Sequence, residues 1–532
     1  MSEPQQQESR QEWTTKIGIV MAVAGSAVGL GNFLRFPGQA AANGGGAFMI
    51  PYFIALLLLG IPIGWAEWTM GRYGGQRGFH SAPAILGAVA RNRAFRYIGV
   101  VGVLIPLVVS FYYTYIEAWC LAYALKYLAG GIGINTAAPI PEQTTAAKDF
   151  FVHVTGQLQN GLNTGDTHFT FYCWIVTFII NIFLVYRGIS GGIEKFCSLA
   201  MPTMAICAIV VLGRVLTLGT PDPSLPDQNV INGLGYMWTP KWEYLANPQT
   251  WVAAAGQIFF SLSVGFGVII NYASYMKKKS DVVLSGLTAS ATNEVFEVSF
   301  GGLITLTAAF IFLGAAGTAS VQGSSFGLGF STLPVVFAQM GGVGNIIGFV
   351  WFFMLFLAAI TSSISMYQPS LAFFQEALGW SKQKTTTLLV STCVTGSFLT
   401  MYFSKDLMFL ATLDDWVGTL FIFILGSIQL ICFGWMFDLE KGWEEAHQGS
   451  SIRIPTFYKV VIKYIAPVYL LAIFGSFCYQ NLPEWIKAVA AEPTRQYAVG
   501  LIVVIIGLLV TCLAAGEKRW EEKGLGLEGK AE

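Results

Sequence analysis

Long apolar segments follow one another along almost the whole chain. A helix needs about 20 apolar residues to cross a bilayer, and twelve segments come near that length, at 14–39, 46–73, 94–128, 169–186, 193–216, 249–274, 282–314, 343–377, 384–403, 407–434, 456–480 and 494–516. Backbone polar groups in hydrocarbon must be satisfied within the protein, which a helix of this length achieves. Only 11% of the residues are charged, against about 25% in soluble domains. The sequence therefore predicts an all-α polytopic membrane protein with twelve transmembrane helices.

The positively charged residues indicate the orientation. Lys and Arg concentrate in every second loop, as at 277–279, and are sparse in the loops between. Loops rich in these residues face the cytoplasm, so we expect both termini there and the protein in the cell membrane. The expected organisation is a cytoplasmic segment at 1–13, a single transmembrane domain at 14–516 and a cytoplasmic tail at 517–532.

Cysteine and histidine usage speaks against an enzyme. The eight cysteines fall in or near apolar segments and the four histidines are scattered, neither at metal-ligand spacing. The chain shows no nucleotide-binding loop and no nucleophile–base set. We expect no catalytic residues, no organic cofactor and no nucleic-acid partner.

Two of the apolar segments are interrupted by glycines. Residues 25–37 read GSAVGLGNFLRFP, and residues 259–267 read FFSLSVGFG. A broken helix is tolerated in a membrane where it lines a cavity or a ligand, and breaks in the first and sixth segments fit an inverted repeat of five helices. Exposed carbonyls at a break can hold a small cation, and the N–H groups of a half-helix can hold a carboxylate. Sodium and an amino acid are natural ligands for such a pair of breaks.

These motifs carry a family resemblance. GSAVGLGNFLRFP at 25–37, NGGGAFMIPY at 43–52, GIPIGWAEWTMGRYGG at 60–75, GQIFFSLSVGFG at 256–267, SGLTASATNE at 285–294 and LAAITSSIS at 357–365 resemble the neurotransmitter:sodium symporter family. The match is closest to its bacterial amino-acid members. The resemblance implies the LeuT-like fold: helices 1–5 and 6–10 form a 5+5 inverted repeat, helices 11 and 12 are additional, and helices 1 and 6 are unwound at the midplane. It also implies alternating access, in which a bundle holding both broken helices rocks against a scaffold.

The resemblance implies two sodium sites built from neutral oxygen atoms, which suit a hard cation. The first would use the Ala27 carbonyl, Asn32, Ser261, Asn293 and the substrate carboxylate. The second would use the carbonyls of Gly25, Val28 and Ala358 and the hydroxyls of Thr361 and Ser362. Without the resemblance, Asn293 could equally make an interhelical hydrogen bond, and the two hydroxyls could bond back to their own helix.

The substrate pocket also follows from the resemblance. The carboxylate would lie near Leu30, Gly31 and Tyr113, and the amino group near the carbonyls of Ala27 and Phe260 and the Ser263 region. The side chain would be surrounded by Val109, Phe260, Phe266, Ser362 and Met366, with Ser261 at the border of the sodium site. An ionised group there would stay unpaired at a cost of several kcal/mol, so we expect a neutral, apolar α-amino acid. The sequence does not show whether the substrate is leucine, alanine, methionine or a larger amino acid. Ser26 and Met366 replace the asparagine and isoleucine of the most similar bacterial member, so the size of the preferred substrate can differ.

Charged residues are expected to act as gates. Arg35 lies deep in the first segment, where an unpaired cation costs at least ~2.5–3.5 kcal/mol, and the resemblance pairs it with Asp414, or alternatively Asp415, above a lid of Phe266 and Tyr113. On the cytoplasmic side Arg10 would pair with Glu376, and Trp13 would plug the inner path; alternatively, Arg10 is a solvated terminal charge. The spacing of Gly192 and Pro202 in the fifth segment resembles the family's site of helix unwinding.

Glu297 bears on the anion requirement. Animal relatives coordinate a chloride ion near this position through a hydroxyl residue, whereas a carboxylate supplies the negative charge itself, with Gln257 and Tyr52 nearby. We therefore expect transport without chloride, and protonation of Glu297 in the substrate-free return step. The alternative is a structural acid bonded to neighbouring helices.

The expected function is a sodium:amino-acid symporter. One alternative is a channel or facilitator, although the repeated pore loops and charged rings typical of channels are missing from the sequence. A second is a sensor on the same scaffold that binds substrate without transporting it. The sequence leaves the sodium stoichiometry and the oligomeric state open, with a homodimer as one of the arrangements.

Overall fold

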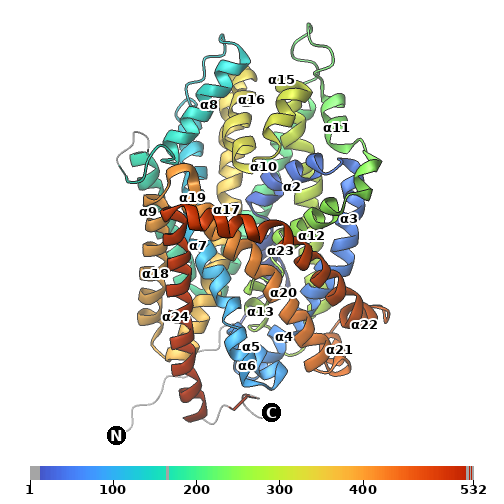
Figure 1. Cartoon of the computed structure of the whole chain (residues 1–532), viewed down its shortest axis with the longest axis vertical. Coiled ribbons are helices and arrows are strands. Elements are labelled where there is room, and N and C mark those ends of the chain that lie inside the picture. The colour runs from blue at the N-terminus through green and yellow to red at the C-terminus, as the bar shows by residue number, and fades with distance from the viewer. Residues whose placement is uncertain (1–11, 163–166, 523–525, 528, 530–532) are drawn as a thin grey trace.

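The computed structural model describes residues 12–162, 167–522, 526–527 and 529 (Figure 1). Within these residues the regular structure is helical and contains no strand. The longer helices are α1 (Lys16–Ala27), α2 (Leu30–Ala42), α4 (Ile61–Gln76), α7 (Val101–Leu128), α8 (Ile140–Val154), α9 (Thr167–Tyr186), α10 (Lys195–Leu216), α12 (Pro248–Leu262), α14 (Val282–Glu294), α15 (Gly302–Val321), α17 (Gly344–Leu378), α18 (Lys382–Tyr402), α20 (Ile422–Ile431), α23 (Ala466–Ala491) and α24 (Pro493–Glu522).

Shorter helices and single turns join or extend these. The short helices are α3 (Met49–Ala55), α5 (Ala82–Ala90), α6 (Arg93–Ile98), α11 (Val230–Trp238), α13 (Val268–Ala273), α16 (Leu333–Gln339), α19 (Met408–Leu413), α21 (Leu439–His447) and α22 (Tyr458–Val460). The 3₁₀ turns are η1 (Gly46–Phe48), η4 (Trp242–Ala246), η7 (Gly341–Val343) and η8 (Lys405–Leu407). The π-helical turns are η2 (Leu56–Gly60), η3 (Ile189–Glu194), η5 (Val295–Gly301), η6 (Gly327–Thr332), η9 (Asp414–Phe421), η10 (Cys432–Met436) and η11 (Val461–Ile465).

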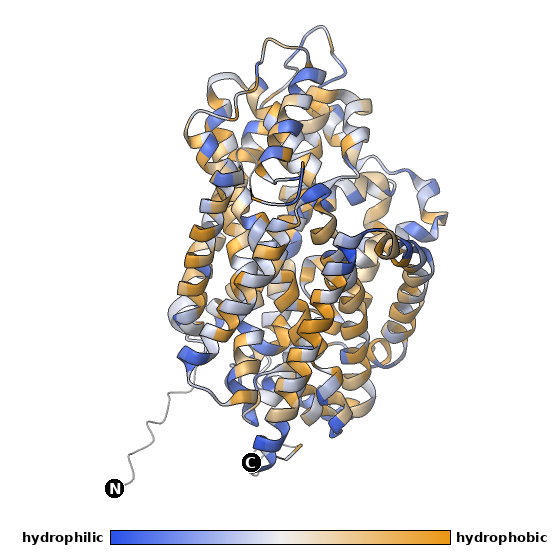
Figure 2. Cartoon of the chain, turned by 60° about the vertical axis from the view of Figure 1, so that its left-hand side comes forward, coloured by the Kyte–Doolittle hydropathy of each residue, from blue (hydrophilic) through white to orange (hydrophobic). Residues whose placement is uncertain are grey.

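The described part contains nine helical stretches long and apolar enough to cross a membrane, and the bent pair α1–α2 makes a tenth. Hydrophobic residues dominate these long helices, and hydrophilic residues gather in the loops and at the two ends of the molecule (Figure 2). The two other predicted segments are also helical: 249–274 is the broken pair α12 and α13, and 384–403 is the threonine-rich α18. Twelve membrane-spanning helices therefore remain a prediction.

Two long helices form the centre of the molecule. α7 and α17 pack against each other along their length, and α9 and α18 pack against α7 (Figure 1). α1 packs against α10, α14 and α17, and α2 packs against α15 and η5. The first broken helix is therefore enclosed by other helices. α5, α6 and α21 lie at the lower end of Figure 1 with the end of α24, and α8 and α11 lie at the upper end.

The first predicted break separates α1 from α2 at residues 28–29, where the two helices meet at 50°. The backbone N–H of Gly29, which precedes α2, donates to the side-chain Oδ1 of Asn32 (2.9 Å), so the third residue of the helix caps its start. A Cβ atom at Gly29 would lie 2.9 Å from the Tyr113 hydroxyl of α7. Glycine at this position therefore lets the break lie directly against α7.

The second predicted break lies between α12 and α13. Ser263, Gly265 and Gly267 have positive φ values of 54°, 69° and 87°, a conformation that glycine adopts most readily. A Cβ atom at Gly267 would also collide with the backbone carbonyl of Gly102 in α7. Both breaks thus depend on glycines that allow close approach to α7.

Candidate ion and substrate-binding site

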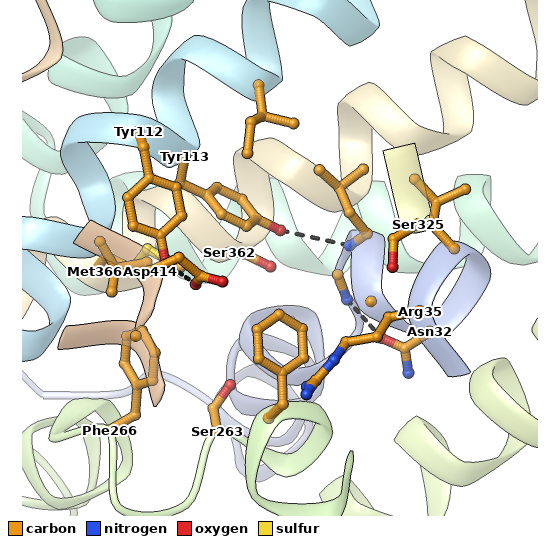
Figure 3. A pocket seen from close by; sticks show the side chains of 18 of the residues that line it. Asn32, Arg35, Tyr112, Tyr113, Ser263, Phe266, Ser325, Ser362, Met366 and Asp414 are labelled. Carbon is orange, nitrogen blue, oxygen red and sulfur yellow. Dashed lines mark hydrogen bonds between the residues drawn. The ribbon is translucent and has the colours of Figure 1, made fainter. Parts of the chain in front are cut away.

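A cavity of about 220 Å³ lies between the two breaks (Figure 3). Its wall comes from the α1–α2 break, α7, the end of α12 with the residues that follow it, α17, α19 and η9. The lining is mostly apolar, with a few hydroxyl groups and with Arg35 and Asp414 as its charged side chains. An apolar cavity with a few polar groups is typical of a small-molecule site.

The predicted substrate residues come together around this cavity. Those that line it are Ala27, Leu30, Gly31, Val109, Tyr113, Phe260, Ser263, Phe266, Ser362 and Met366. Ser261 lies outside the lining, because its side chain is turned toward Asn293 of α14, whose Nδ2 donates to the serine hydroxyl (2.7 Å). Ser261 is therefore placed in the predicted ion cluster rather than in the cavity wall.

The start of α2 faces the cavity. The backbone N–H of Leu30 lies 3.5 Å from the Tyr113 hydroxyl (Figure 3), and N–H groups in the first turn of a helix have no partner in that helix. These groups also form the positive end of the helix dipole. The Tyr113 hydroxyl and the Ser362 hydroxyl both lie next to Gly29. This corner of the cavity is suited to a carboxylate.

The side chains predicted for the first sodium ion converge in one buried cluster. Asn32 Nδ2 donates to Asn293 Oδ1 (2.9 Å) and lies 3.5 Å from the Ser261 hydroxyl. All three side chains are at most 2% exposed. They come from α2, α12 and α14, and Ala27, the last residue of α1, lines the same cavity as Asn32. The cluster gathers neutral oxygen donors from both broken helices, the ligand type that a hard cation takes.

The residues predicted for the second sodium ion lie where α1 and α17 meet. The Ser362 hydroxyl lies 3.0 Å from the Ala358 carbonyl and 3.5 Å from the Gly25 carbonyl, so it contacts both helices. The Thr361 hydroxyl donates back to the Ala358 carbonyl (3.0 Å), which is the local bond that the sequence leaves open as an alternative. Val28 follows directly after the last residue of α1. All five predicted residues are therefore near the α1–α17 contact.

Glu297 is buried directly beside the first cluster. Gln257 Nε2 donates to its Oε1 (2.7 Å), and the amides of the two asparagines of the cluster donate to its Oε2 at 3.1 and 3.4 Å. The Tyr52 hydroxyl, which the sequence places near Glu297, donates to Glu294 (2.8 Å), a second acid that lies one turn earlier on α14. Tyr52 therefore interacts with both carboxylates.

The predicted outer gate is not paired in this structure. No ion pair within 4.0 Å joins Arg35 to Asp414 in the described part of the chain. The Arg35 guanidinium instead lies 4.6 Å from the centre of the Phe260 ring, and Asp414 accepts a hydrogen bond from Tyr112 (2.6 Å). In Figure 3 the labelled side chains of Arg35 and Asp414 lie apart, and no dashed line joins them. The pairing expected from the sequence is thus replaced by separate local contacts.

Trp13, which is predicted to plug the inner path, packs against α13. Its indole N–H donates to the backbone carbonyl of Tyr272 in α13 (2.9 Å), and the side chain is buried. Arg10 lies outside the described residues. Glu376, its expected partner, accepts hydrogen bonds from the backbone N–H groups of His80 (3.3 Å) and Ser81 (2.9 Å).

The family model of the sodium:neurotransmitter symporters matches residues 10–522. The chain belongs to this family. An uncharacterized sodium-dependent transporter of Methanocaldococcus jannaschii is 28% identical over 469 residues, which cover 87% of this chain and 89% of the relative. Sodium-dependent nutrient amino acid transporter 1 of Drosophila mojavensis is 26% identical over 513 residues, covering 88% and 76%. The crystal structure of MhsT in complex with L-phenylalanine superposes with a TM-score of 0.73 at 25% identity, covering 88% of this chain and 99% of MhsT.

This symporter is accordingly a multi-pass membrane transporter and not an enzyme. Its cavity is also lined by Ser26, to which the sequence assigned no contact, and by residues that were not predicted at all, among them Ile116, Ser325, Phe326 and Leu410. The sequence could have predicted Ile116 as a lining residue, since it lies on the same helix face as Val109 and Tyr113. Residues 325–326 precede η6 and carry no local signal that would place them over the cavity.

Proposed function

We propose that this protein is a sodium-coupled symporter that imports a neutral, apolar α-amino acid by alternating access. The observation that carries the proposal is one cavity bordered by both helix breaks, with the two predicted ion clusters beside it. The sodium-dependent nutrient amino acid transporters of Drosophila and the phenylalanine complex of MhsT support an amino acid as the substrate.

The lining of the cavity supports the substrate class. Around Val109, Phe266 and Met366 the wall is apolar, and its charged groups are limited to Arg35 and Asp414. An ionised substrate side chain next to the apolar residues would lose its hydration without gaining a partner, at a cost of several kcal/mol. A neutral side chain avoids this cost, while the start of α2 takes the carboxylate.

Two sodium ions are expected to be carried with the amino acid. The first would bind at the Asn32, Ser261 and Asn293 cluster, where the substrate carboxylate can complete its ligands, and the second between α1 and α17. Because the first ion and the substrate share a carboxylate, each would bind more tightly when the other is present. This linkage is the physical basis for coupled transport.

We also propose that transport is independent of chloride. Glu297 places a carboxylate beside the first ion cluster, held by Gln257 and the two asparagines. A fixed negative group next to a cation site supplies the charge that a chloride ion would otherwise bring. Protonation of Glu297 in the substrate-free return step would then keep the empty site neutral.

The proposed arrangement in the membrane has twelve spanning helices within residues 14–516, built as a 5+5 inverted repeat with two additional helices. The N-terminal segment 1–13 and the tail 517–532 would lie in the cytoplasm, since Lys and Arg are concentrated in the loops at that end. The lower end of Figure 1 is then the cytoplasmic end, and the protein would lie in the cell membrane.

Reconstituted protein tests this proposal. Uptake of each of the twenty amino acids into proteoliposomes is measured with an inward gradient of sodium or of choline. We expect one or more neutral, apolar amino acids to accumulate above the outside concentration in sodium and not in choline. Equal uptake in both salts would indicate a facilitator or channel, and sodium-dependent binding without accumulation would indicate a sensor; either result would overturn the proposal.

A further inference from the structure

The amino-terminal end of α1 is held by a carboxylate from another helix. Glu194, the last residue of η3, accepts hydrogen bonds from the backbone N–H groups of Thr14 (2.8 Å) and Thr15 (3.0 Å) and from the Thr15 hydroxyl (2.9 Å). Glu194 is only 6% exposed, and the first turn of α1 contains no acidic residue. The unpaired N–H groups and the positive dipole end of α1 therefore find their negative partner on η3.

The contact between α1 and η3 is close enough to require a glycine. A Cβ atom at Gly18 would collide with the Glu194 carboxylate. The N–H of Gly18 donates to the Thr15 hydroxyl (2.9 Å), which itself donates to Glu194, so the cap and the carboxylate form one network. On its other side, the start of α1 is tied to α13 through Trp13 and Tyr272, whose rings lie 5.2 Å apart, edge to face.

The opposite end of α1 carries the proposed sodium ligands. The helix is only 12 residues long and ends at Ala27. The end that contacts Glu194 and the end that carries the proposed sodium ligands therefore belong to one short helix. η3 itself is irregular: Gly188 before it has a φ of 81°, and its residues form a π-helical turn. Such turns are uncommon and occur often at functional sites. A shift of η3 would therefore be transmitted through α1 to the ion ligands.

We propose that Glu194 is a latch that holds α1 in the position closing the cytoplasmic side, and that this contact must break for the substrate to leave. The inference rests on the proposed function as a symporter. Glu194 contacts neither the substrate cavity nor the ion clusters, so it is a positioning residue that acts through α1. When the latch opens, three hydrogen bonds to the Glu194 carboxylate are replaced by hydrogen bonds to water. The free-energy difference between the closed and the open position of α1 is therefore small.

The accessibility of Cys197 to a thiol reagent can show whether the latch is open. Cys197 lies one turn after Glu194 and is fully buried, and its Sγ lies 3.6 Å from the position of a Cβ atom at Gly25 in α1. If α1 leaves η3, this thiol becomes accessible to water. The rate at which N-ethylmaleimide alkylates Cys197 can be followed by mass spectrometry in the full-length protein without replacing the other cysteines.

The test compares Glu194→Gln and Gly18→Ala with the unsubstituted protein in choline, in sodium, and in sodium with substrate. Gln keeps the size of the side chain but removes its charge, whereas the Ala methyl group displaces the carboxylate. We expect alkylation in choline to become about tenfold faster, the factor that corresponds to the loss of one charged helix cap. Sodium with substrate should slow it again, and the sodium concentration for half-maximal substrate binding should rise by a similar factor.

Glu440→Gln is the matched control, because it removes the same charge from an exposed side chain that is paired with Lys459 at the same end of the molecule. It should leave the alkylation rate unchanged.

The proposal would be overturned if Glu194→Gln and Gly18→Ala were both alkylated at rates within twofold of the unsubstituted protein. Faster alkylation without any change in sodium affinity would also overturn it. If Gly18→Ala does not fold, Glu194→Gln decides alone. Alkylation in choline requires neither transport nor substrate, so it tests the latch separately, whereas a failure of the proposed function appears in the uptake assay of the unsubstituted protein.

Discussion

Asn32 serves the fold and the candidate site with one side chain. Its Oδ1 accepts the N–H of Gly29 at the start of α2, and its Nδ2 reaches Asn293 and Glu297. An amide offers two donors and one acceptor group in fixed geometry, which neither a serine nor an aspartate would supply. Substitution of Asn32 would disturb both the helix cap and the ion cluster, so the cluster is tested more cleanly at Asn293.

Asn293→Leu should weaken sodium-dependent substrate binding. The change deletes a ligand oxygen and leaves the partners of Asn293 in a buried site without hydrogen bonds, at about 1–3 kcal/mol for each. Binding of labelled substrate is measured against sodium concentration, and half-saturation should rise about tenfold or more. Thr288→Val, on an exposed side chain of the same helix that bonds only to its own turn, is the control. Unchanged sodium dependence in Asn293→Leu would show that the first ion binds elsewhere.

Glu297→Ser should make uptake depend on chloride. The substitution removes the fixed negative charge and leaves a hydroxyl and a space beside the cation cluster, which an anion can occupy to restore neutrality. Uptake is compared in sodium chloride and sodium gluconate. We expect equal rates for the unsubstituted protein and about a tenfold lower rate in gluconate for the variant. The same rate in both salts for the variant would contradict the role given to the Glu297 charge.

Ser26 shows what sequence alone does not reveal about a single residue. The resemblance assigns it no role, but its hydroxyl forms a hydrogen bond with the Ser365 hydroxyl of α17 (2.7 Å), and it lines the cavity. The partnership joins residues 339 positions apart, so it follows from how α1 packs on α17 and not from any local pattern. The hydrogen bond from Tyr52 to Glu294 has the same origin, since it depends on how α3 packs against the end of α14 and not on a local pattern.

At the scale of elements, the helix breaks are the features that sequence predicts best. Glycines inside an apolar run are costly in a helix, so the runs at 25–37 and 259–267 mark breaks that the structure places at residues 28–29 and 263–267. The π-helical turns such as η5 and η9 were not predicted, because they lie inside apolar segments whose residue pattern does not distinguish a π-helical turn from an α-helical one. The sequence also could not place residues 325–326 over the cavity, since that position depends on the packing of η6.

Gly267→Ala should destabilise the protein and weaken substrate binding. The residue has a φ of 87°, and the added methyl group would collide with the Gly102 carbonyl; backbone strain of this kind costs about 1–3 kcal/mol. Thermal unfolding in detergent is measured with and without substrate. Gly475→Ala, in a helical position of α23 with open space around it, should be neutral or slightly stabilising. Equal unfolding temperatures for the two variants would mean that the second break does not need its glycine.

At the scale of the whole molecule, the predicted gate at one end of the cavity is unpaired, whereas the start of α1 at the other end is held by several contacts. The cavity extends to Arg35 and Asp414, which remain apart, whereas Trp13 and the Glu194 latch hold the start of α1 at the other end. An alternating-access transporter open on one side must be closed on the other. Within the proposed alternating-access cycle, the structure therefore corresponds to a state in which the expected outer pair of Arg35 and Asp414 has not formed. This explains why a contact expected from sequence can be absent from one conformation.

Arg35 and Asp414 should matter for transport more than for binding. In this state the guanidinium lies over Phe260 and the carboxylate is bonded to Tyr112, so neither needs the other until the outer side closes. Arg35→Gln and Asp414→Asn should each lower sodium-driven uptake by about tenfold, which corresponds to loss of a buried, charged contact of about 1.4 kcal/mol in the closed state. Substrate binding in sodium should change by less than about threefold. The double variant should transport as poorly as either single variant, because both remove the same contact. Additive losses of uptake in the double variant would show that the two side chains act independently and that the outer gate is built from other residues.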